Sequence, residues 1–560
     1  MKIKFLILIL LFMQAISVLP QKPIPEKVFA CTDRNTYIAG ETILYQLNII
    51  DTSSGKTGNL SSTGYVVLRS QESGAVAEQR LRFTDRMAFG KINLPDTLRT
   101  GLYELTAYTN FQRNFGEKSF FRKQILIVQQ STANQYVLNV PNSVVPDSAA
   151  SIHPALSTDS VIFKQRASVH LKIAPVPAGG IVSVSVFEDI NNGHFPTLSS
   201  TMGDSFVSDK NIDSETPFLA ERKGKILEGK VIDEKNNPVP EGAIVLLSRR
   251  DTVPNLEYAV TDANGSFRFL LDDYYEGKEL FLSIKNATDT TRWVIKTDDK
   301  FAPDLTEALV QKALKNNELI KKSQNIVYIN SSYGLQNDPL TSRTEANKSI
   351  ANKHRFFNCP VNTLRPADYV SLNDFPEIIT ELFPLIRNSG NKERYEIKVV
   401  GATTDFYGYS GPAVFLDGVY VDNLNKIKKL GSDKIEKIDV IYNERTFGDL
   451  IFQGMVSIKS RGTLVTGKNT DFNSVTIQND SLSNIQPDIL SCKIPGENST
   501  YPFVNQLLYW RPNMVLTDKN ETELEFNTTD NTGNYTIKLE GITANGERIF
   551  STQHFTVIRQ

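Results

Sequence analysis

A single stretch in the later half of the chain, Gly411 to Asp422, most constrains the fold. It reads Gly-Pro-Ala-Val-Phe-Leu-Asp-Gly-Val-Tyr-Val-Asp. Side chains alternate on both sides of Asp417-Gly418, and an Asp-Gly pair between two alternating runs is a strong signal for a tight hairpin turn. The sequence therefore predicts two short antiparallel strands joined at Asp417-Gly418.

Two later segments extend this pattern, the stretch Asp433 to Ile441 and the stretch Gly454 to Gly462. Together the three segments resemble the plug domain of TonB-dependent outer-membrane receptors. In that family a D-G-V turn is followed by a helix reading I-x-x-I-x-V and by a last strand reading G-x-V-x-I. The resemblance implies a small α/β domain over residues 356–463, with a helix near Asp433 to Ile441.

The same resemblance raises a question of length. A receptor of this family carries a barrel of about 22 strands, each of about 9–11 residues. Only 98 residues follow Gly462 in this sequence. We therefore expect a plug-like domain without a receptor barrel, so that any role in transport depends on a partner.

The amino end predicts a secretory signal peptide over residues 1–21. Two lysines precede an apolar run from Phe5 to Val18, which is too short to span a bilayer comfortably. We expect the mature chain to begin between Val18 and Lys22 and to have no transmembrane span. Charged residues separate Cys31 from the apolar run, which argues against a lipid anchor at that cysteine.

Composition narrows the class of partner. The net charge is −2 and no strongly basic stripe is present, which argues against nucleic acid. The three cysteines, Cys31, Cys359 and Cys492, are too widely spaced for a disulfide framework. We interpret them as small buried hydrophobic residues.

Residues 24–130 show alternating strands separated by turns. They resemble the macroglobulin-type β-sandwich of bacterial alpha-macroglobulins, which keeps a D-R-x-x-Y-x-x-G-E start and an L-P-x-x-L-x-x-G-x-Y-x-L-x-A-Y end. The matching residues are Asp33, Arg34, Tyr37, Gly40, Glu41, Gly101, Tyr103, Ala107 and Tyr108. Glycines of this kind serve turns and tyrosines pack, so we interpret all of them as residues that maintain the fold.

Residues 131–222 alternate less regularly and predict a second sandwich of the same type. Residues 223–300 resemble the carboxypeptidase regulatory-like domain, a small transthyretin-like sandwich that commonly precedes plug domains in Bacteroidetes-type receptors. The matching residues are Gly229, Val231, Asp233, Pro238, Val239, Ala243, Thr261, Asp262, Gly265, Phe267 and Phe269. Gly265 closes a turn between two strands and is expected to have a positive φ.

Residues 301–355 are expected to form a helical and polar linker, with helix spacing of apolar residues from Asp304 to Lys322. A second amphipathic helix is predicted from Asp374 to Arg387. Residues 464–560 return to a β pattern and resemble the macroglobulin-type sandwich that recurs in large Bacteroidetes exported proteins. There we interpret Trp510 and Tyr535 as core residues.

Residues that carry chemistry are sparse. The five histidines lie outside any H-x-x-E or H-E-x-x-H pattern, and no thioester, nucleophile elbow or P-loop is seen. They are His153, His170, His194, His354 and His554. Aspartates at 272–273, 298–299, 417 and 422 lack an EF-hand pattern and are better explained as turn residues. We therefore expect no catalytic, cofactor-binding or metal-binding residue, and no cofactor.

The sequence thus predicts a mainly β, exported protein made of tandem β-sandwiches, macroglobulin-like and transthyretin-like, with one small plug-like α/β domain. The function expected is non-catalytic: a binding or scaffold component in the periplasm or at the outer membrane, with an envelope protein such as an outer-membrane barrel as its partner. Two alternatives remain open. One is an accessory subunit of a TonB-dependent uptake system that binds a glycan or peptide, and the other is a macroglobulin-like protease inhibitor without a thioester.

Overall fold

The computed structural model divides the chain into two compact units. Unit 1 comprises Met1–Lys223, Lys300–Glu345 and Leu482–Gln560, and unit 2 comprises Gly224–Asp299 and Ala346–Ser481. The structure describes residues 21–23, 25–51, 60–70, 74–129, 137–138, 151–189, 200–201, 206–208, 218–272, 275–285, 292–298, 301–302, 312–313, 325, 328–329, 362–391, 394–400, 411–462, 474–480, 482, 489–491, 502–543 and 547–559. Within these ranges, no helix is long and apolar enough to cross a membrane. The predicted fold class, mainly β with tandem sandwiches and one small α/β domain, is confirmed.

Sandwich 1, the first domain of unit 1, packs two sheets around one apolar core. One sheet has the order β2-β4-β7, and the other has the order β16-β9-β8-β5-β6 with β3 added beside β9. The strands are β2 (Glu26–Thr32), β3 (Thr36–Ile38), β4 (Thr42–Asp51), β5 (Thr63–Ser70), β6 (Gly74–Arg82), β7 (Met87–Asn93), β8 (Gly101–Tyr108), β9 (Phe121–Val128) and β16 (Ser200–Thr201), with the short helices η1 (Phe111–Phe115) and η2 (Glu117–Ser119). Two further pairs are β1 (Gln21–Pro23) with β17 (Phe206–Ser208), and β10 (Val137–Leu138) with β24 (Lys312–Ala313).

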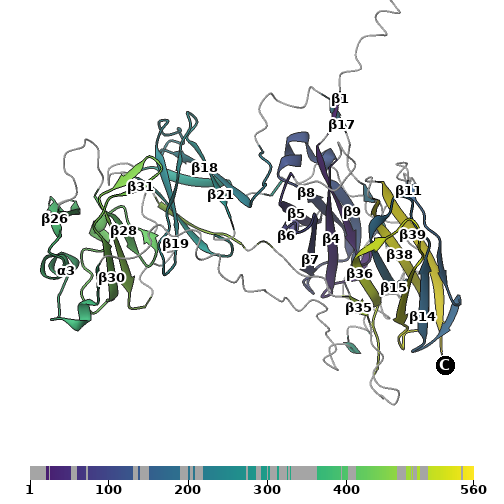
Figure 1. The fold of residues 1–560 in the computed structure, drawn as a ribbon. Helices are drawn as coiled ribbons and strands as arrows, with labels where there is room; N and C mark the ends of the chain where they lie inside the picture. Colours follow the sequence, from purple (N-terminus) through teal and green to yellow (C-terminus); the bar gives the residue numbers. More distant parts are fainter. Residues whose placement is uncertain are drawn as a thin grey trace, which may run out of the picture. The chain divides into compact units, whose positions relative to one another are not determined.

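Sandwich 2, also in unit 1, is built from two distant parts of the chain. Strand β15 lies between β36 and β38 and pairs with both in antiparallel register (Figure 1). The early strands are β11 (Ser151–Ile152), β12 (Leu156–Thr158), β13 (Ile162–Lys164), β14 (Ser168–Ile173) and β15 (Gly180–Glu188). The late strands are β35 (Leu490–Ser491), β36 (Leu507–Leu516), β37 (Thr522–Asn527), β38 (Gly533–Thr543) and β39 (Arg548–Ile558). Side chains from both parts fill one core.

This arrangement differs from the predicted boundaries, which placed one sandwich at 131–222 and another at 464–560. The early part supplies β11, β13 and β15 of the large sheet, which do not pair with one another, and two strands of the small sheet, so neither part has enough paired strands to cover a core alone. The chain between β15 and β35 therefore includes the whole of unit 2, together with β16, β17 and β24 of unit 1. At the point of insertion the backbone N–H of Glu188 donates to the carbonyl of Gln506 at 2.7 Å.

Sandwich 3, in unit 2, corresponds to the predicted regulatory-like domain and packs two small sheets of orders β21-β18-β23 and β20-β19-β22-β34. The strands are β18 (Lys225–Ile232), β19 (Ile244–Arg249), β20 (Glu257–Val260), β21 (Ser266–Leu271), β22 (Glu279–Ile284), β23 (Val294–Asp298) and β34 (Ser474–Gln478). Strand β34 lies beyond the predicted boundary at residue 300. It pairs with β22, and its Val475 and Ile477 pack on the core.

The α/β domain of unit 2 has a five-stranded sheet of order β25-β30-β33-β28-β29. Its strands are β25 (Asn362–Leu364), β28 (Ala413–Leu416), β29 (Val419–Tyr420), β30 (Ile435–Ile441) and β33 (Met455–Ser460), with the hairpins β26 (Ile386–Gly390)–β27 (Tyr395–Val399) and β31 (Arg445–Phe447)–β32 (Leu450–Phe452). The short helices are η4 (Pro366–Asp368) and η5 (Leu424–Lys426). The predicted hairpin is present: Leu416 pairs with Val419 across Asp417 and Gly418, whose φ angles are 52° and 86°.

The prediction of a helix near Asp433 to Ile441 is wrong, because this segment forms strand β30. A register shift between Ile435 and Lys437 interrupts its pairing with β33. Such an irregularity lets residues three apart face the same core, so Ile435 and Ile438 mimic helix spacing within a strand. The β-branched residues of this segment also favour a strand.

The helix predicted from Asp374 to Arg387 is shorter than expected. Helix α3 (Phe375–Leu382) begins with Asp374 as its N-cap, whose side chain accepts the N–H of Glu377. It ends before Pro384, which disfavours helical backbone at the preceding residue. The predicted helix from Asp304 to Lys322 lies outside the described residues except at Lys312–Ala313, which form β24 and not a helix.

Sandwich 3 and the α/β domain contact one another within unit 2 through the predicted hairpin. The backbone N–H of Asp251 donates to the carbonyl of Asp417 at 3.2 Å, and the N–H of Tyr420 donates to Ser248 Oγ at 3.2 Å. Beside these bonds, an apolar cluster joins Leu246 and Leu256 to Phe415 and Phe452. The Asp417-Gly418 turn is thus a point of attachment between two domains.

Candidate functional site: a buried ionic network between two sandwiches

The sheet β2-β4-β7 of sandwich 1 is covered on both faces. On β4, Ile43, Tyr45 and Leu47 enter the core of sandwich 1. The alternate residue Leu44 packs on Trp510 of β36, and Gln46 accepts the backbone N–H of Asn513 at 2.9 Å. Strand β4 is therefore buried on both faces, and its polar residue Gln46 lies in the contact between the two sandwiches.

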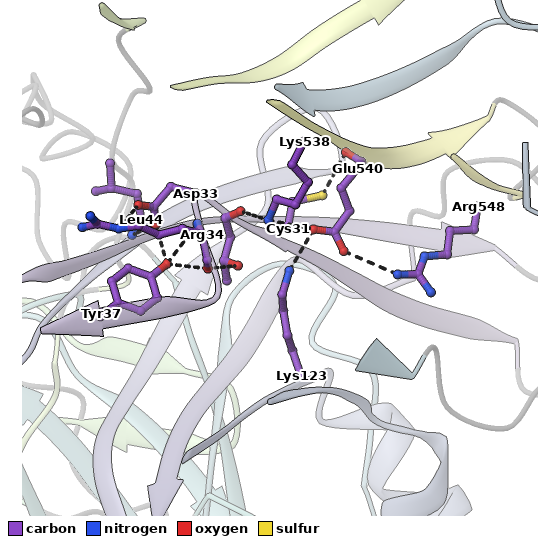
Figure 2. Close-up of polar contacts among 10 residues, drawn as sticks. Cys31, Asp33, Arg34, Tyr37, Leu44, Lys123, Lys538, Glu540 and Arg548 are labelled. Atoms are coloured by element: carbon purple, nitrogen blue, oxygen red, sulfur yellow. Dashed lines mark hydrogen bonds and ion pairs between the residues drawn. The ribbon is translucent and has the colours of Figure 1, made fainter. Parts of the chain in front are cut away.

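Glu540 on β38 lies at the centre of this contact. Its Oε2 accepts a hydrogen bond from Lys123 Nζ of β9 at 2.8 Å and lies 3.3 Å from Lys538 Nζ (Figure 2). Its Oε1 lies 3.7 Å from Arg548 Nη2 of β39. We call these four residues the Glu540 network. Three cations from three strands therefore surround one buried carboxylate.

Two more contacts connect the Glu540 network to β2. Lys538 Nζ donates to the carbonyl of Thr32 at 2.7 Å. The Cys31 Sγ donates to the backbone carbonyl of Glu540 at 3.3 Å. Cys31 is a free, buried cysteine, as predicted, and Cys359 and Cys492 lie outside the described residues.

The charges and the burial of the Glu540 network shift the pKa values of its members. Burial alone would raise the pKa of Glu540, but the charges of Lys123 and Lys538 outweigh burial and lower the pKa to about 2. Burial, assisted by the charge of Lys123, lowers the pKa of Lys538 to about 8. Burial raises the pKa of the Cys31 thiol far above its usual range. The carboxylate is therefore ionised and the thiol protonated at neutral pH.

The D-R-x-x-Y-x-x-G-E motif forms a second network beside the first. Asp33 Oδ1 accepts both the hydroxyl of Tyr37 at 2.6 Å and the backbone N–H of Leu44 at 2.9 Å (Figure 2). The Arg34 guanidinium lies 3.2 Å from Asp33 and 3.4 Å from Glu41, and it donates to Gln506 Oε1 at 3.1 Å. The motif thus shapes the turn between β2 and β4 and also reaches sandwich 2.

These groups hold the fold and are poorly placed for reaction. Cys31 is 1 % exposed, Lys538 4 % and Glu540 1 %, so a substrate does not reach them. A protonated buried thiol is a poor nucleophile. The arrangement gives the contact a defined geometry, since each buried charge has partners on more than one strand.

The other residues considered from the sequence are dispersed. Asp417 accepts from the backbone N–H and the hydroxyl of Ser460, at 2.8 Å and 2.7 Å. Trp510 and Tyr535 are fully buried, as predicted. The remaining described candidates have separate surroundings: His153 bonds to the Phe550 carbonyl, His170 to Asp159, and His554 to Thr536. His194, His354, Asp273 and Asp299 lie outside the described residues. In the part of the chain that the structure describes, no group of three His, Cys, Asp or Glu side chains is placed to hold a metal ion.

The sequence analysis missed the Glu540 network. Lys538 and Glu540 alternate with Ile537 and Leu539, a pattern typical of a strand with one solvated face. The one hint is the length of β4, along which apolar and polar residues alternate. So long a strand suggests that another domain covers the outer face of its sheet. The partner of each charge lies in a distant segment, which local periodicity does not reveal.

No family model matches this chain, and no curated protein matches it. Among solved structures, it is similar to Salmonella alpha-2-macroglobulin reacted with methylamine, at 9 % identity and a TM-score of 0.24, over 97 % of this chain and 40 % of the other. For Escherichia coli alpha-2-macroglobulin activated by porcine elastase the values are 10 %, 0.23, 95 % and 44 %. For the Escherichia coli adhesin FdeC they are 12 %, 0.15, 53 % and 66 %. The chain spans about two fifths of the length of these macroglobulins. Sequence identities and TM-scores this low establish no shared activity.

Proposed function

We propose that this chain is an exported, non-catalytic envelope protein that acts as a binding or scaffold component in the periplasm or at the outer membrane. One observation carries the proposal: unit 2 is inserted between two neighbouring strands of sandwich 2. The chain leaves β15 at Glu188 and reaches β36 just after Gln506, and the N–H of Glu188 donates to the Gln506 carbonyl. Because β15 and β36 pair within a complete sandwich, the chain between them can present unit 2 to a partner without disturbing that sandwich.

The Glu540 network supports the same proposal. It fixes sandwich 1 and sandwich 2 to one another with buried charges, which favour one defined arrangement over many. A fixed base is what a scaffold requires. Under this proposal, the ionisable groups of the Glu540 network stabilise the structure of unit 1 and take part in no reaction.

The test compares three proteins in envelope extracts of the source organism. These are the full chain, a variant in which residues 224–299 and 346–481 are each replaced by a short Gly/Ser linker, and a fragment that joins 224–299 to 346–481 through such a linker. We expect the full chain and the fragment to capture the same partner, identified by cross-linking and mass spectrometry, and the deletion variant to lose it. An uptake receptor as the captured partner would favour the accessory role, and a protease would favour inhibition.

The same preparations test the absence of catalysis. We expect no turnover of peptide or glycoside substrates by the full chain. Hydrolysis that a single polar substitution abolishes would contradict the proposal.

A further inference from the structure

The outer face of one sheet of sandwich 1 carries aromatic residues where a solvated face is expected. On β5, Val66 and Leu68 enter the core, whereas Tyr65 and Val67 face away from it. Tyr65 stacks on Tyr108 of β8 at 5.4 Å between ring centroids, and Tyr108 stacks on Phe120 at 4.4 Å. We call Tyr65, Tyr108 and Phe120, with Arg69 and Arg80, the Tyr65 platform.

Two residues from a distant part of the chain cover the Tyr65 platform. The ring of Phe301 meets the ring of Tyr65 edge to face, with centroids 5.5 Å apart. The backbone N–H of Ala302 donates to the hydroxyl of Tyr108 at 2.7 Å. The carbonyl of Ala302 accepts a hydrogen bond from Arg69 Nη2 at 2.6 Å.

These contacts differ from ordinary chain packing. Phe301 and Ala302 belong to no strand, yet side chains of the platform bond to both backbone polar groups of Ala302. The guanidinium of Arg80 lies 4.5 Å from the Phe301 ring centroid, a distance typical of a cation–π contact. Arg69 and Arg80 are almost completely buried although they lie on the outer side of a sheet. Recognition of backbone groups together with an aromatic side chain is how proteins bind short extended peptides.

Sandwich 1 makes the same kind of contact with a second aromatic residue, Phe218. The guanidinium of Arg113 lies 3.9 Å from the ring centroid of Phe218. Asn114 donates to the Phe218 carbonyl at 2.7 Å and accepts the Phe218 N–H at 3.0 Å. Phe218 precedes sandwich 3 in the chain, and Phe301 follows it. Sandwich 1 therefore binds an aromatic ring and backbone groups from the segment that precedes sandwich 3 in the chain and from the segment that follows it.

We propose that the Tyr65 platform is a peptide-recognition surface for an extended aromatic–small dipeptide, and that the chain's own Phe301–Ala302 occupies it as an in-chain ligand. Specificity comes from three features. Arg80 and Tyr65 accept an aromatic ring, Tyr108 and Arg69 bind the backbone of the next residue, and the burial of Ala302, which is 4 % exposed, favours a small side chain. This inference is independent of the proposed scaffold role.

The test uses the full chain and a fluorescein-labelled peptide of residues 299–304, Asp-Lys-Phe-Ala-Pro-Asp. In the wild type, the in-chain segment competes at a high effective concentration, whereas Phe301→Ala weakens the competitor. Fluorescence anisotropy should therefore show binding to Phe301→Ala at least about tenfold tighter than to the wild type. A peptide with Ser in place of Phe is the control ligand and should not bind.

A second substitution makes the test specific for recognition. Tyr108→Phe keeps the stacked ring and removes only the hydroxyl that accepts the Ala302 N–H. In the Phe301→Ala background it should weaken peptide binding several-fold. In the otherwise wild-type chain it should reduce hydrogen-exchange protection of the Ala302 amide and leave that of β8 unchanged, which remains measurable if Phe301→Ala proves unstable.

Three results would overturn the proposal. They are equal binding of the peptide to wild type and Phe301→Ala, equal binding of the Phe and Ser peptides, and unchanged protection of Ala302 in Tyr108→Phe. A wild-type dimer that Phe301→Ala converts to a monomer would also overturn it, because the segment would then come from a second copy.

Discussion

Lys123 and Glu540 lie 417 positions apart in the chain, and their side chains form a buried ion pair at 2.8 Å. Lys123 comes from β9 of sandwich 1, and Glu540 comes from β38 of sandwich 2. The pair therefore joins the two sandwiches through one buried carboxylate, beside the contact of Leu44 with Trp510.

Glu540→Gln should destabilise unit 1 by about 3–5 kcal/mol, because the substitution leaves the buried Lys123 and Lys538 without their counter-charge. The combined variant Lys123→Met/Lys538→Met/Glu540→Leu should be close to the wild type, since it removes both buried lysines together with their partner. Urea unfolding followed by fluorescence measures both. A single variant as stable as the wild type would show that the network contributes little.

Acid should weaken unit 1 through Glu540. Its pKa falls from an ordinary value of 4.5 to about 2 in the folded chain, so the unfolded chain binds the proton more readily. The stabilisation is complete above pH 4.5 and is lost as the pH falls from there towards 2. Urea midpoints at a series of pH values should show this loss in the wild type, and Glu540→Gln should lack that part of the dependence.

Alkaline pH should have the opposite effect through Lys538. Its pKa is about 8 in the folded chain against an ordinary 10.5, so between these values the unfolded chain holds more protons. The contribution of Lys538 to stability should therefore increase as the pH rises from about 8 to 10.5. The difference in urea midpoint between the wild type and Lys538→Met, measured at pH 7, 8, 9 and 10, reports this contribution. A constant difference would contradict the assignment.

Gly265→Val should destabilise sandwich 3 by more than the ~1 kcal/mol typical of a point mutant. Gly265 has a φ of 69°, as predicted, and a Cβ there would lie 2.5 Å from the carbonyl oxygen of Val231. Gly242→Val is the matched control, because Gly242 also has a positive φ but has no atom within 4 Å of an added Cβ. Thermal unfolding of the fragment 224–481, which includes β34, should give the lower midpoint for Gly265→Val.

Gly418→Ala should disturb the contact between sandwich 3 and the α/β domain. An added Cβ would lie 2.5 Å from both the nitrogen and the oxygen of Asp251. Gly462→Ala is the control, with a similar positive φ and open space around it. Hydrogen exchange should show faster exchange of the Asp251 and Tyr420 amides in Gly418→Ala alone, while the strands β18 and β33 keep their protection. Loss of protection throughout both domains would indicate global unfolding instead.

The sequence alone was sufficient for features that depend on neighbours in the chain. The turn at Asp417-Gly418, the positive φ of Gly265 and the burial of Trp510 all follow from local pattern and residue type. Features that depend on distant segments were beyond it. The pairing of β15 with β36 crosses more than three hundred residues, and no periodicity specifies which strand fills that position.

The candidate site was harder to predict than the fold for the same reason. Glu540 occupies a position that an exposed glutamate would also occupy, and its importance comes from a lysine on another domain. The prediction for β30 was wrong for a different reason. The resemblance to plug domains implied a helix there, and the register shift gives Ile435 and Ile438 a spacing of three that also suits a helix.

The interruption of sandwich 2 has a consequence for biogenesis. During synthesis the chain emerges from its amino end, so β15 appears long before β36 and β38, the two strands that flank it. Until then, both hydrogen-bonding edges of β15 lack partners, and exposed edges of apolar strands invite aggregation. Sandwich 1 and unit 2 complete their strands earlier. The slow, chaperone-dependent stage of maturation should therefore be the final one, in which the last strands enclose β15.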